Sequence, residues 1–438
     1  MGRPSINSYY QWIKCALMLR IFIQHSIMGN TTSKTGSQLI AMEPKKTTVF
    51  KQTCGVTYRI PALIYLREDQ SYLAFAEKRS SPCDSDAKII VMRKGTLLKG
   101  SIQWSPSREL LSACLPGHRT MNPCPVYERN SKTLFLFFIC IQSKTSEHHQ
   151  IMTGRNAARL CYVSSKDNGL TWSKVTDLTD GVIGKKVRKW ATFAVGPGHG
   201  IQMENGRLVI PAYVYYIHCK CVCIPFPCTI QPHAFSFYSD DRGETWHVGQ
   251  IIQRKSCECE MAEIINRDGK SHLYCNARNT RGHRVEALSE TNGNSFDKPR
   301  LAPKLVEQSR GGCQGSVIGF PVPEYISEDQ DGVNKDDANL PFSLDTQTWL
   351  LFSHPTNKRN RSDLGVYLNR SPLHTLRWEH PWIIHSGPSG YSDLAYCEQD
   401  HFACLMECGK QSELEEIAFV DFHLTDVIEA IDDKLKIS

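Results

Sequence analysis

The stretch Ser165-Lys166-Asp167-Asn168-Gly169-Leu170-Thr171-Trp172 returns twice along a chain of 438 residues. The second copy spans residues 239–246 (Ser-Asp-Asp-Arg-Gly-Glu-Thr-Trp), and a more divergent third copy spans residues 289–296 (Ser-Glu-Thr-Asn-Gly-Asn-Ser-Phe). The shared pattern is typical of a hairpin turn, in which the aspartate binds backbone amides and the glycine takes a positive φ. A calcium loop is disfavoured, because the alternating acidic ligands and terminal glutamate of an EF-hand are missing.

The spacing of these turns favours a propeller over a sandwich. Each copy follows an apolar strand-like run, and the starts at 165, 239 and 289 are 74 and 50 residues apart. Such spacing fits one four-stranded blade per repeat with loops of variable length. Short apolar or alternating segments occur throughout the chain from Thr47 onward, including residues 72–76, 88–92, 134–141, 208–214, 349–353 and 417–420. The sequence therefore predicts an all-β protein, with its best helical window at residues 424–437.

The first 45 residues differ from the rest and are predicted to be a poorly ordered extension. Residues 12–28 are apolar, but Arg20 interrupts them, so we expect neither a spanning helix nor a typical signal peptide there. Residues 28–33 (Met-Gly-Asn-Thr-Thr-Ser) match the N-myristoylation pattern if translation starts at Met28. We therefore hypothesise a shorter form that is myristoylated on Gly29.

Residues 46–438 are predicted to form one propeller domain, interrupted by a flexible insertion at residues 324–346. That insertion is polar, acidic and rich in Gly and Asn, and it lies between two apolar runs. Composition elsewhere is that of a globular protein, with 41% hydrophobic and 22% charged residues. The net charge of +6 is scattered, so a nucleic-acid partner is not expected.

Cysteine usage indicates folding in a reducing compartment. The chain has 18 cysteines, and several, such as Cys140, Cys161 and Cys275, lie inside apolar runs, where a free thiol behaves as a small hydrophobe. The sequon Asn360-Arg361-Ser362 contains a candidate ligand-binding arginine, and a glycan there would obstruct the site proposed below.

Three arginines lie at strand ends far apart in the sequence. Arg59 lies in Tyr58-Arg59-Ile60-Pro61, Arg278 follows the run 273–277, and Arg361 follows the run 349–355. A guanidinium is always charged and can hold a carboxylate through two parallel hydrogen bonds. We expect the three side chains to converge on one anionic group.

Tyr58-Arg59-Ile60-Pro61 together with the repeated Asp-containing turns resembles the sialidase (exo-α-neuraminidase) family. Segments 117–125, 154–161 and 190–200 resemble, more narrowly, vertebrate plasma-membrane ganglioside sialidases. The resemblance covers roughly residues 47–425. It implies a six-bladed β-propeller of four-stranded antiparallel blades, and an enzyme that removes terminal α-linked sialic acid.

By this resemblance Arg59, Arg278 and Arg361 bind the carboxylate of the sialic acid. Clustered positive charges are costly to bury unless an anion or acidic partners compensate them. Glu407 resembles the family glutamate that orients the first of these arginines.

The resemblance assigns the chemistry to three further residues. Asp84, in a short loop, is the implied general acid and base, and Tyr391 is the implied nucleophile. A neutral phenol avoids the repulsion that a carboxylate nucleophile would meet from the substrate carboxylate, but it needs a base because its free pKa is about 10. Glu258 matches that base, although Glu260 and Glu263 lie nearby and the sequence alone does not exclude them.

The remaining pocket is assigned by the same resemblance. Tyr213 and Tyr215 are two residues apart and face the same side of a strand, so they serve either as contacts to the N-acyl and glycerol groups or as packing residues. The residues expected near the substituents of the sugar ring are Glu77, Arg79, Asn122 and Glu147.

The implied reaction is retaining hydrolysis through a tyrosyl-enzyme intermediate, without cofactor or metal, and preferably on gangliosides. Two alternatives share the fold: a sialic-acid-binding propeller lectin, which keeps the arginines but not the acid or nucleophile, and a trans-sialidase, which differs in acceptor access. A propeller that serves only as an interaction platform has no need of the three arginines.

The segment 218–228 (His-Cys-Lys-Cys-Val-Cys-Ile-Pro-Phe-Pro-Cys) is an unusual loop. A zinc site is disfavoured, because Cys257-x-Cys259 is a weak second pair. Beside a plain exposed loop, we hypothesise membrane contact through acylated Cys219, Cys221 and Cys223. Together with ganglioside substrates, this predicts a peripheral protein of the plasma membrane and endosomal membranes without a transmembrane helix.

Overall fold

The computed structural model describes residues 43–437, except 143, 221–226, 281, 310, 324–345 and 375–376. The chain divides into two compact units, Met1–Met42 and Glu43–Ser438, and all elements described below belong to the second. The predicted N-terminal extension up to residue 42 and nearly all of the predicted insertion 324–346 lie outside the described residues.

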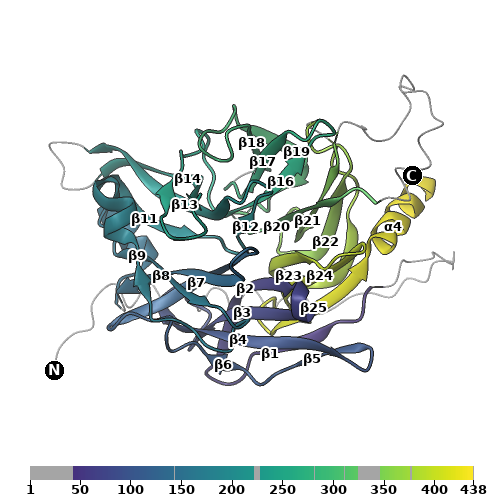
Figure 1. The fold of residues 1–438 in the computed structure, drawn as a ribbon, viewed down its shortest axis with the longest axis horizontal. Coiled ribbons are helices and arrows are strands. Elements are labelled where there is room, and N and C mark those ends of the chain that lie inside the picture. Colours follow the sequence, from purple (N-terminus) through teal and green to yellow (C-terminus); the bar gives the residue numbers. More distant parts are fainter. Residues whose placement is uncertain are drawn as a thin grey trace, which may run out of the picture. The chain divides into compact units, whose positions relative to one another are not determined.

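The strands of the described residues form five antiparallel sheets set around one axis (Figure 1). Four of the sheets are single blades. The first contains β2 (Thr57–Leu66), β3 (Ser71–Arg79), β4 (Ala87–Leu98), β5 (Ser101–Trp104) and β6 (Arg108–Glu109), and the second contains β7 (His118–Glu128), β8 (Thr133–Gln142), β9 (Ala158–Ser165) and β10 (Thr176–Asp177). The third contains β11 (Trp190–Val195), β12 (Ile201–Gln202), β13 (Leu208–Lys220), β14 (Pro227–Ser239) and β15 (His247–Val248), and the fourth contains β16 (Cys259–Ile265), β17 (Ser271–Ala277), β18 (His283–Ser289) and β19 (Arg300–Val306).

The fifth sheet has seven strands and comprises two blades that share one long strand. That strand, β23 (Trp382–Tyr396), pairs with β22 through residues 382–388 and with β24 through residues 389–396. One blade is therefore β20 (Ser316–Pro321), β21 (Thr348–Pro355), β22 (Ser362–Asn369) and the first half of β23. The other is the second half of β23 with β24 (His401–Cys408), β25 (Glu416–His423) and β1 (Thr47–Lys51). The described residues therefore form six blades of four main strands each, and the short strands β6 and β12 pair additionally with β4 and β13. The predicted propeller fold is confirmed.

The ring of blades is closed by contacts between inner strands and by the start of the chain. β2 contacts β7, β7 contacts β11, β13 of the third blade contacts β16, β16 contacts β20, β20 contacts β23, and β23 returns to β2. β1, the first strand of the described residues, completes the sheet of the last blade by pairing with β25. The inner strands of all six blades therefore meet at one hub.

The repeated turns join the third and fourth strands of their blades. In the copy at residues 239–246, the Ser239 hydroxyl donates to Asp241 at 2.8 Å and accepts from the Gly243 amide at 2.8 Å. Asp241 also accepts from the Thr245 amide at 2.8 Å, and residues 165–172 make the same bonds. These bonds confirm the predicted turn, in which aspartate and serine bind neighbouring amides.

The divergent third copy keeps this frame with a different side chain. Thr291 stands where the other copies have aspartate, and its hydroxyl accepts from the Ser295 amide at 2.9 Å. The Ser289 hydroxyl still accepts from the Gly293 amide at 2.8 Å, and Gly293 has a φ of +88°. A hydroxyl at the third position of the repeat is therefore sufficient to hold the turn.

The aromatic residue of the turn packs between blades. Trp246 is buried, with its ring centroid 4.6 Å from that of Phe137 on the second blade in an edge-to-face arrangement. Phe135, Phe193 and Phe235 belong to the same cluster of buried side chains. Burial of such rings stabilises the contact between consecutive blades, and edge-to-face pairs add about 0.5–1.5 kcal/mol each.

In the described part of the chain, two α-helices lie outside the sheets. α4 (Leu424–Ile437) confirms the predicted helical window, and its buried residues include Leu424, Val427 and Ile431, which belong to the cluster formed with β24 and β25. α2 (Glu147–Thr153) was not predicted, because seven residues are too short to show a helical period. Shorter helical turns are η1 (Arg67–Asp69), η2 (Asp84–Asp86), η3 (Thr179–Ile183) and η4 (Gly184–Lys189).

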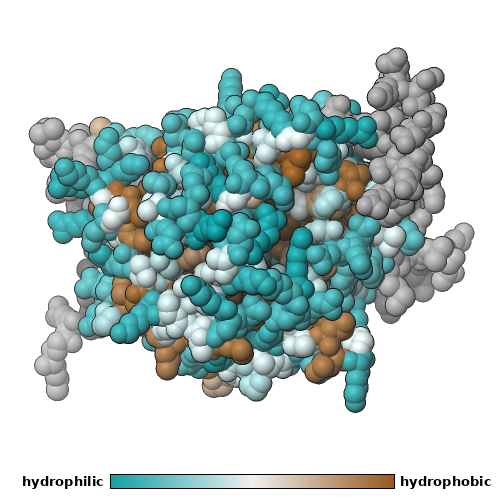
Figure 2. All heavy atoms as spheres, in the orientation of Figure 1, coloured by the Kyte–Doolittle hydropathy of each residue, from teal (hydrophilic) through white to brown (hydrophobic). Residues whose placement is uncertain are grey.

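The surface and the thiols fit a globular domain. The face shown in Figure 2 is mostly hydrophilic, and its apolar residues form small, separate patches. Among the described residues, the cysteines are all free thiols, and Cys140, Cys161 and Cys275 are buried. Within the described part of the chain, no helix is long and apolar enough to span a membrane.

Candidate active site

A cavity of about 310 Å³ opens at the hub, and all six blades contribute side chains to it. Arg59, Arg278 and Arg361 all line it, although they are more than three hundred positions apart at the extremes. The structure therefore brings the three arginines to one place. The other predicted residues that line it are Arg79, Asp84, Asn122, Glu147, Tyr213, Tyr215, Glu258 and Tyr391.

Tyr391 and Glu258 form a short hydrogen bond in this cavity. The phenol donates to Glu258 Oε1 at 2.6 Å. Arg278 Nη1 donates to Glu258 Oε2 at 2.6 Å and to the phenol oxygen at 3.0 Å. One carboxylate is thus placed to accept the phenol proton, while one guanidinium is placed to stabilise the phenolate that remains.

Strand pairing accounts for the contact between Glu258 and Arg278. The Arg278 amide donates to the Glu258 carbonyl at 2.8 Å, and the Cys257 amide donates to the Arg278 carbonyl at 2.8 Å. These bonds continue the ladder in which Cys259 of β16 faces Ala277 of β17. The two functional side chains therefore leave neighbouring strand ends side by side.

Arg59 is fixed by a buried carboxylate. Its Nε and Nη2 groups donate to the two oxygens of Glu407 at 3.0 and 3.2 Å. Glu407 also accepts from the amides of Ile60 at 2.9 Å and Tyr391 at 3.1 Å. One glutamate thus holds the arginine fork and the backbone of the tyrosine in a single network.

The backbone around Arg59 is bent by a bulge. The β2–β3 register shifts between Arg59 and Ala62, and Ile60 has a φ of +59°, which is rare for a β-branched residue. The next blade repeats this arrangement, since Asn122 has a φ of +58° beside a register shift in β7. In both strands the left-handed residue precedes a proline and lines the cavity. Strain of this kind collects where the backbone must present a side chain to a site.

Arg361 completes the ring around Tyr391. Its Nη2 group donates to the Gly312 carbonyl at 2.9 Å, and its guanidinium carbon lies 5.3 Å from the centroid of the Tyr391 ring. Arg59 lies at the same distance of 5.3 Å from that ring. Among the described residues, no hydrogen bond engages the Nη1 groups of Arg59 and Arg361, so these donors can bind a ligand.

The charges in this network shift the ionisation of both Tyr391 and Glu407. Burial and the charge of Glu258 raise the pKa of Tyr391 well above its ordinary value, although Arg278, Arg361 and Arg59 oppose the shift. Burial alone would also raise the pKa of Glu407, but the charge and hydrogen bonds of Arg59 lower it. In the ligand-free site Tyr391 is therefore a neutral phenol and Glu407 a carboxylate.

Asp84 lies on the first blade within the loop between β3 and β4. It is the most exposed of the acidic groups there, with 58% of its side chain accessible, and it accepts from Arg79 Nη1 at 2.6 Å. Arg79 in turn pairs with Glu77 at 2.6 Å. Glu77 is fully buried, accepts from the Asn122 amide at 2.7 Å, and does not line the cavity. It therefore supports Arg79 and Asn122 from behind.

Glu147 enters the cavity from α2. The helix begins after Ser146, whose side chain accepts from the His149 amide. Arg119, which also lines the cavity, donates to the carbonyls of Gln142 at 3.1 Å and Thr145 at 2.7 Å and so holds the segment before the helix. The sequence did not point to this arginine, because its role depends on a loop whose path the sequence does not show.

Burial and the nearby charges of Asp84 and Glu258 raise the pKa of Glu147 to about 7. An acid with a raised pKa in the folded state binds more protons than in the unfolded state, so its stability contribution falls as the pH rises from the ordinary glutamate value to about 7. We expect E147Q to be about 1–2 kcal/mol more stable relative to the wild type at pH 8 than at pH 4.5, as measured by urea unfolding. The exposed Glu429→Gln serves as control, and a difference that stays flat with pH would refute the assignment.

Tyr213 and Tyr215 both line the cavity from β13. Their ring centroids are 6.3 Å apart in an edge-to-face arrangement, which agrees with two residues on the same side of a strand. Burial raises the pKa of each phenol, so both stay neutral. They can donate hydrogen bonds to a ligand and also pack against the blade.

The two competing glutamates lie outside this cavity. Glu260 is buried and accepts from Ser316 at 2.7 Å and from the Val317 amide at 3.0 Å. Glu263 accepts from Ser271 at 2.6 Å and from the Glu204 amide at 2.8 Å. Of the three candidates only Glu258 contacts Tyr391 among the described residues.

The only described group with the composition of a metal site is His199, Glu260 and Asp393, whose ligand atoms lie within 4.8 Å of one another. The carboxylate oxygens of this group already accept hydrogen bonds from the amides of Leu63 and Val317. These bonds make the three residues part of a hydrogen-bonded cluster at the hub. Of the cysteine segment 218–228, Cys219 is exposed, while Cys221 and Cys223 lie outside the described residues.

Comparison with known proteins agrees with this geometry. The family of BNR repeat-like domains matches residues 71–404. The chain is 49% identical over 405 residues to Sialidase-3 of Bos taurus, covering 89% of this chain and 92% of that protein. It is also 49% identical to Sialidase-3 of Homo sapiens, covering 83% and 89%, and 43% identical to Sialidase-2 of Mus musculus, covering 87% and 95%.

Solved structures show the same fold at lower identity. The Hadza microbial sialidase Hz136 superposes with a TM-score of 0.66 at 23% identity, covering 85% of this chain and 66% of that chain. The intramolecular trans-sialidase from Ruminococcus gnavus superposes with a TM-score of 0.65 at 14% identity, covering 88% and 98%. With relatives at 49% identity over most of its length, the chain belongs to the sialidase family and is an exo-α-sialidase, a glycoside hydrolase.

Proposed function

We propose that this enzyme hydrolyses its substrate with retention of configuration, through a covalent intermediate on Tyr391. The observation that supports the proposal best is the 2.6 Å hydrogen bond from the Tyr391 phenol to Glu258. A buried tyrosine paired with a carboxylate and surrounded by three arginines has little structural justification. The pair matches the requirements for an activated nucleophile.

Substrate binding would begin with the carboxylate on the anomeric carbon of sialic acid. The Nη1 groups of Arg59 and Arg361 are available donors, and Arg278 lies beside them. Glu407 fixes the Arg59 fork, so binding needs little reorganisation of that side chain. The arrangement also brings the anomeric carbon close to the Tyr391 oxygen.

In the first chemical step the Tyr391 oxygen attacks the anomeric carbon while Glu258 takes the phenol proton. The bond to the glycosidic oxygen breaks, and that oxygen receives a proton from the acid form of Asp84. The aglycone leaves with this proton. The products on the enzyme are a sialyl-tyrosine, a protonated Glu258 and an ionised Asp84.

In the second step water attacks the anomeric carbon from the side that the aglycone left. The Asp84 carboxylate takes one proton of that water, and the Tyr391 oxygen leaves and recovers its proton from Glu258. Two displacements at one carbon retain its configuration. All protons return to their starting residues, so no cofactor is required.

Asp84→Asn tests the acid role through the leaving group. We expect kcat/KM for a sialyl-galactoside to fall about 10²–10⁴-fold, because the alkoxide that leaves needs a proton. For an aryl sialoside, whose phenolate leaves unaided, the loss should be several-fold smaller in the first step. Steady-state rates on both substrates measure the ratio. Equal losses on the two substrates would contradict a proton donor at this position.

The proposed substrates are gangliosides, and the proposed location is the periphery of plasma and endosomal membranes. β13 supports this, since it carries Tyr213 and Tyr215 in the cavity and continues to the exposed Cys219. The triple variant C219S/C221S/C223S should shift from the membrane to the soluble fraction, and unchanged partitioning would reject acylation there. Turnover of a ganglioside against a soluble sialoglycoprotein tests the preference. Mass spectrometry of the N-terminus tests myristoylation of Gly29.

A lectin and a trans-sialidase remain the alternatives for comparison. A lectin does not require an acid or a nucleophile, but this chain has both, in Asp84 and Tyr391. Tyr391 is also hydrogen-bonded to Glu258. Release of sialic acid with and without added galactoside distinguishes the trans-sialidase, since transfer would divert product to the galactoside. We expect free sialic acid as the main product in both assays.

A further inference from the structure

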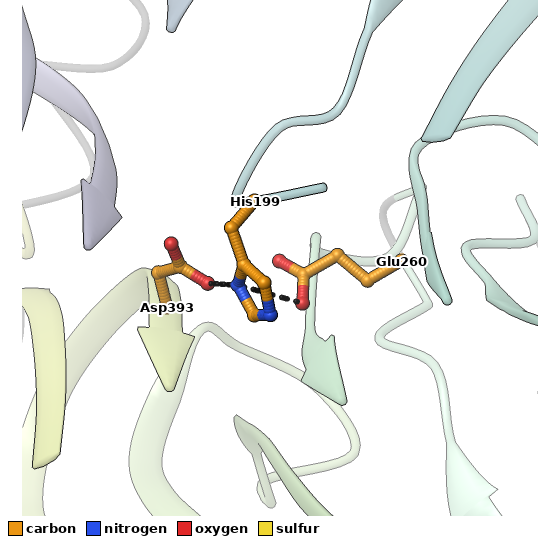
Figure 3. Close-up of side chains that lie close together, drawn as sticks. All are labelled: His199, Glu260 and Asp393. Carbon is orange, nitrogen blue, oxygen red and sulfur yellow. Dashed lines mark hydrogen bonds and ion pairs between the residues drawn. The ribbon is translucent and has the colours of Figure 1, made fainter. Parts of the chain in front are cut away.

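A second pair of carboxyl groups lies two residues further along the chain from the members of the catalytic couple. Glu260 lies on β16, two residues after Glu258, which directly precedes that strand, and Asp393 lies on β23 together with Tyr391. Glu260 and Asp393 are both fully buried, and a carboxyl oxygen of each lies within 4.8 Å of the other. Figure 3 shows His199 between them.

The burial of the two carboxyl groups so close together favours a single proton shared between them. The hydroxyl of Ser316 lies within hydrogen-bonding distance of both, at 2.7 Å from Glu260 and 3.1 Å from Asp393, but it has only one hydrogen to donate. If Glu260 and Asp393 were both ionised, their two buried negative charges would repel each other strongly. When two carboxyl groups share one site, one of them usually keeps its proton at neutral pH. Among the described residues, His199 is the only basic side chain that pairs with either acid, at 2.6 Å from Asp393 and 3.8 Å from Glu260.

The other titratable groups around the pair offer no compensating charge. Cys124 of β7 and Cys404 of β24 are buried thiols, and burial raises the pKa of each, so both are neutral. Burial and the charge of Asp393 likewise raise the pKa of Glu260 well above its ordinary value. Glu260 is therefore the carboxyl group that retains the proton.

Hydrogen bonds from this pair join most of the blades at the hub. Asp393 of the last blade accepts from the Leu63 amide of β2 at 2.6 Å and from Ser316 of β20 at 3.1 Å. Glu260 of β16 accepts from the same Ser316 hydroxyl at 2.7 Å. His199 adds the third blade, from the segment between β11 and β12. The position of β23 relative to β16 thus depends on this cluster.

Gln314 connects the cluster directly to the backbone beside Tyr391. Its side-chain nitrogen donates to Glu260 at 3.1 Å and to the Ser392 carbonyl at 2.9 Å, and its oxygen accepts from the Ser392 amide at 3.0 Å. Gly198 also leaves no space for movement, since a Cβ there would lie 1.6 Å from a Glu260 oxygen. A change in charge at Glu260 would therefore affect Ser392, which lies between Tyr391 and Asp393.

On these grounds we propose that Glu260 and Asp393 hold one proton between them and act as a clamp that keeps Tyr391 within hydrogen-bonding distance of Glu258. Both are positioning residues and neither touches the cavity. The inference rests on the proposed role of the Tyr391–Glu258 couple. His199 lines a separate cavity of about 560 Å³ at the same hub and is the member of the cluster nearest to solvent, with 12% of its side chain exposed.

Comparing E260Q with D393N tests the clamp through kcat and KM separately. E260Q keeps a neutral side chain with a hydrogen-bond donor, so we expect kcat within about threefold of the wild type at neutral pH. D393N replaces one of the two carboxyl oxygens that accept from His199 and Leu63 with an amide nitrogen, so we expect kcat to fall at least about tenfold with KM changed less than about twofold. The arginines that bind the substrate are untouched in both variants. A kcat loss in E260Q as large as in D393N would overturn the shared proton.

The pH dependence of kcat distinguishes the clamp from a purely structural role of Glu260, which would leave that dependence unchanged. In the wild type, deprotonation of Glu260 at alkaline pH places two negative charges face to face, so kcat should fall there while KM changes little. E260Q cannot lose that proton, so its alkaline limb should lie at higher pH than that of the wild type. Identical limbs in the two proteins would overturn the proposal.

Infrared difference spectra of the folded proteins test the proton without an activity assay. At pH 8, where Glu147 with its pKa of about 7 is mostly ionised, the C=O band of a protonated carboxyl group should be present in the wild type and absent in E260Q. No such difference would overturn the proposal even if D393N fails to fold. Y391F in the same kinetic assays separates the two ideas: an active Y391F refutes the mechanism, whereas an inactive Y391F beside a fully active D393N refutes only the clamp.

Discussion

Tyr391→Phe is expected to lower kcat by about a thousandfold or more, with little change in the melting temperature. The change deletes the oxygen that attacks the anomeric carbon and keeps the ring that packs between Arg59 and Arg361. Glu258 still pairs with Arg278 through a 2.6 Å contact, so no unpaired buried charge is created. Initial rates on an aryl sialoside and thermal unfolding of the same sample measure both quantities.

Tyr367→Phe is the matched control for this variant. Tyr367 is a buried tyrosine on β22 that packs against Phe352 and does not line the cavity. Its activity should stay within about twofold of the wild type. Turnover by Y391F above about a tenth of the wild-type rate would exclude Tyr391 as the nucleophile and leave water attack aided by Glu258 as the simpler mechanism.

The second large effect is expected at the arginines, where lysine keeps the charge but loses the planar fork. R361K should raise KM about 100-fold with a smaller change in kcat, because Arg361 contacts the ring of Tyr391 but not its oxygen or Glu258. R278K should lower kcat as well as raise KM, because Arg278 bonds both Glu258 and the phenol oxygen. The comparison separates substrate binding from activation of the nucleophile.

Arg370→Lys is the control for a general effect of changing an arginine. Arg370 forms a two-pronged pair with Glu379 at 2.7 and 2.8 Å and lies outside the cavity. Its KM for an aryl sialoside should match the wild type. If R361K and R370K shared the same unchanged KM, the three arginines would not form the carboxylate site.

The repeated turns predicted the propeller because their chemistry is local. Asp241, Ser239 and Gly243 make their bonds within one short segment, so the pattern alone determines the turn. The number of blades was harder to predict from the sequence. β23 belongs to two blades and β1 completes a blade begun at the other end of the chain, so neither is visible in a repeat of fixed length.

The site residues were less accessible from the sequence than the fold. Glu258, Glu260 and Glu263 lie within six positions, and only the pairing of β16 with β17 and the side-chain contacts of β16 with β20 distinguish the glutamate in the cavity from the two outside it. Glu77 was expected at the sugar ring but is buried behind Arg79. These placements depend on contacts between blades, and sequence patterns report only contacts within an element.

The central claim is that the enzyme forms a covalent bond between sialic acid and Tyr391. A sialosyl fluoride with a second fluorine beside the anomeric carbon slows both displacements but keeps a good leaving group, so the intermediate should accumulate. Digestion and mass spectrometry should then find the sugar on the peptide that contains Tyr391, and Y391F should carry none. A sugar attached instead to Glu258 or Asp84, or no adduct together with inverted product, would contradict the account.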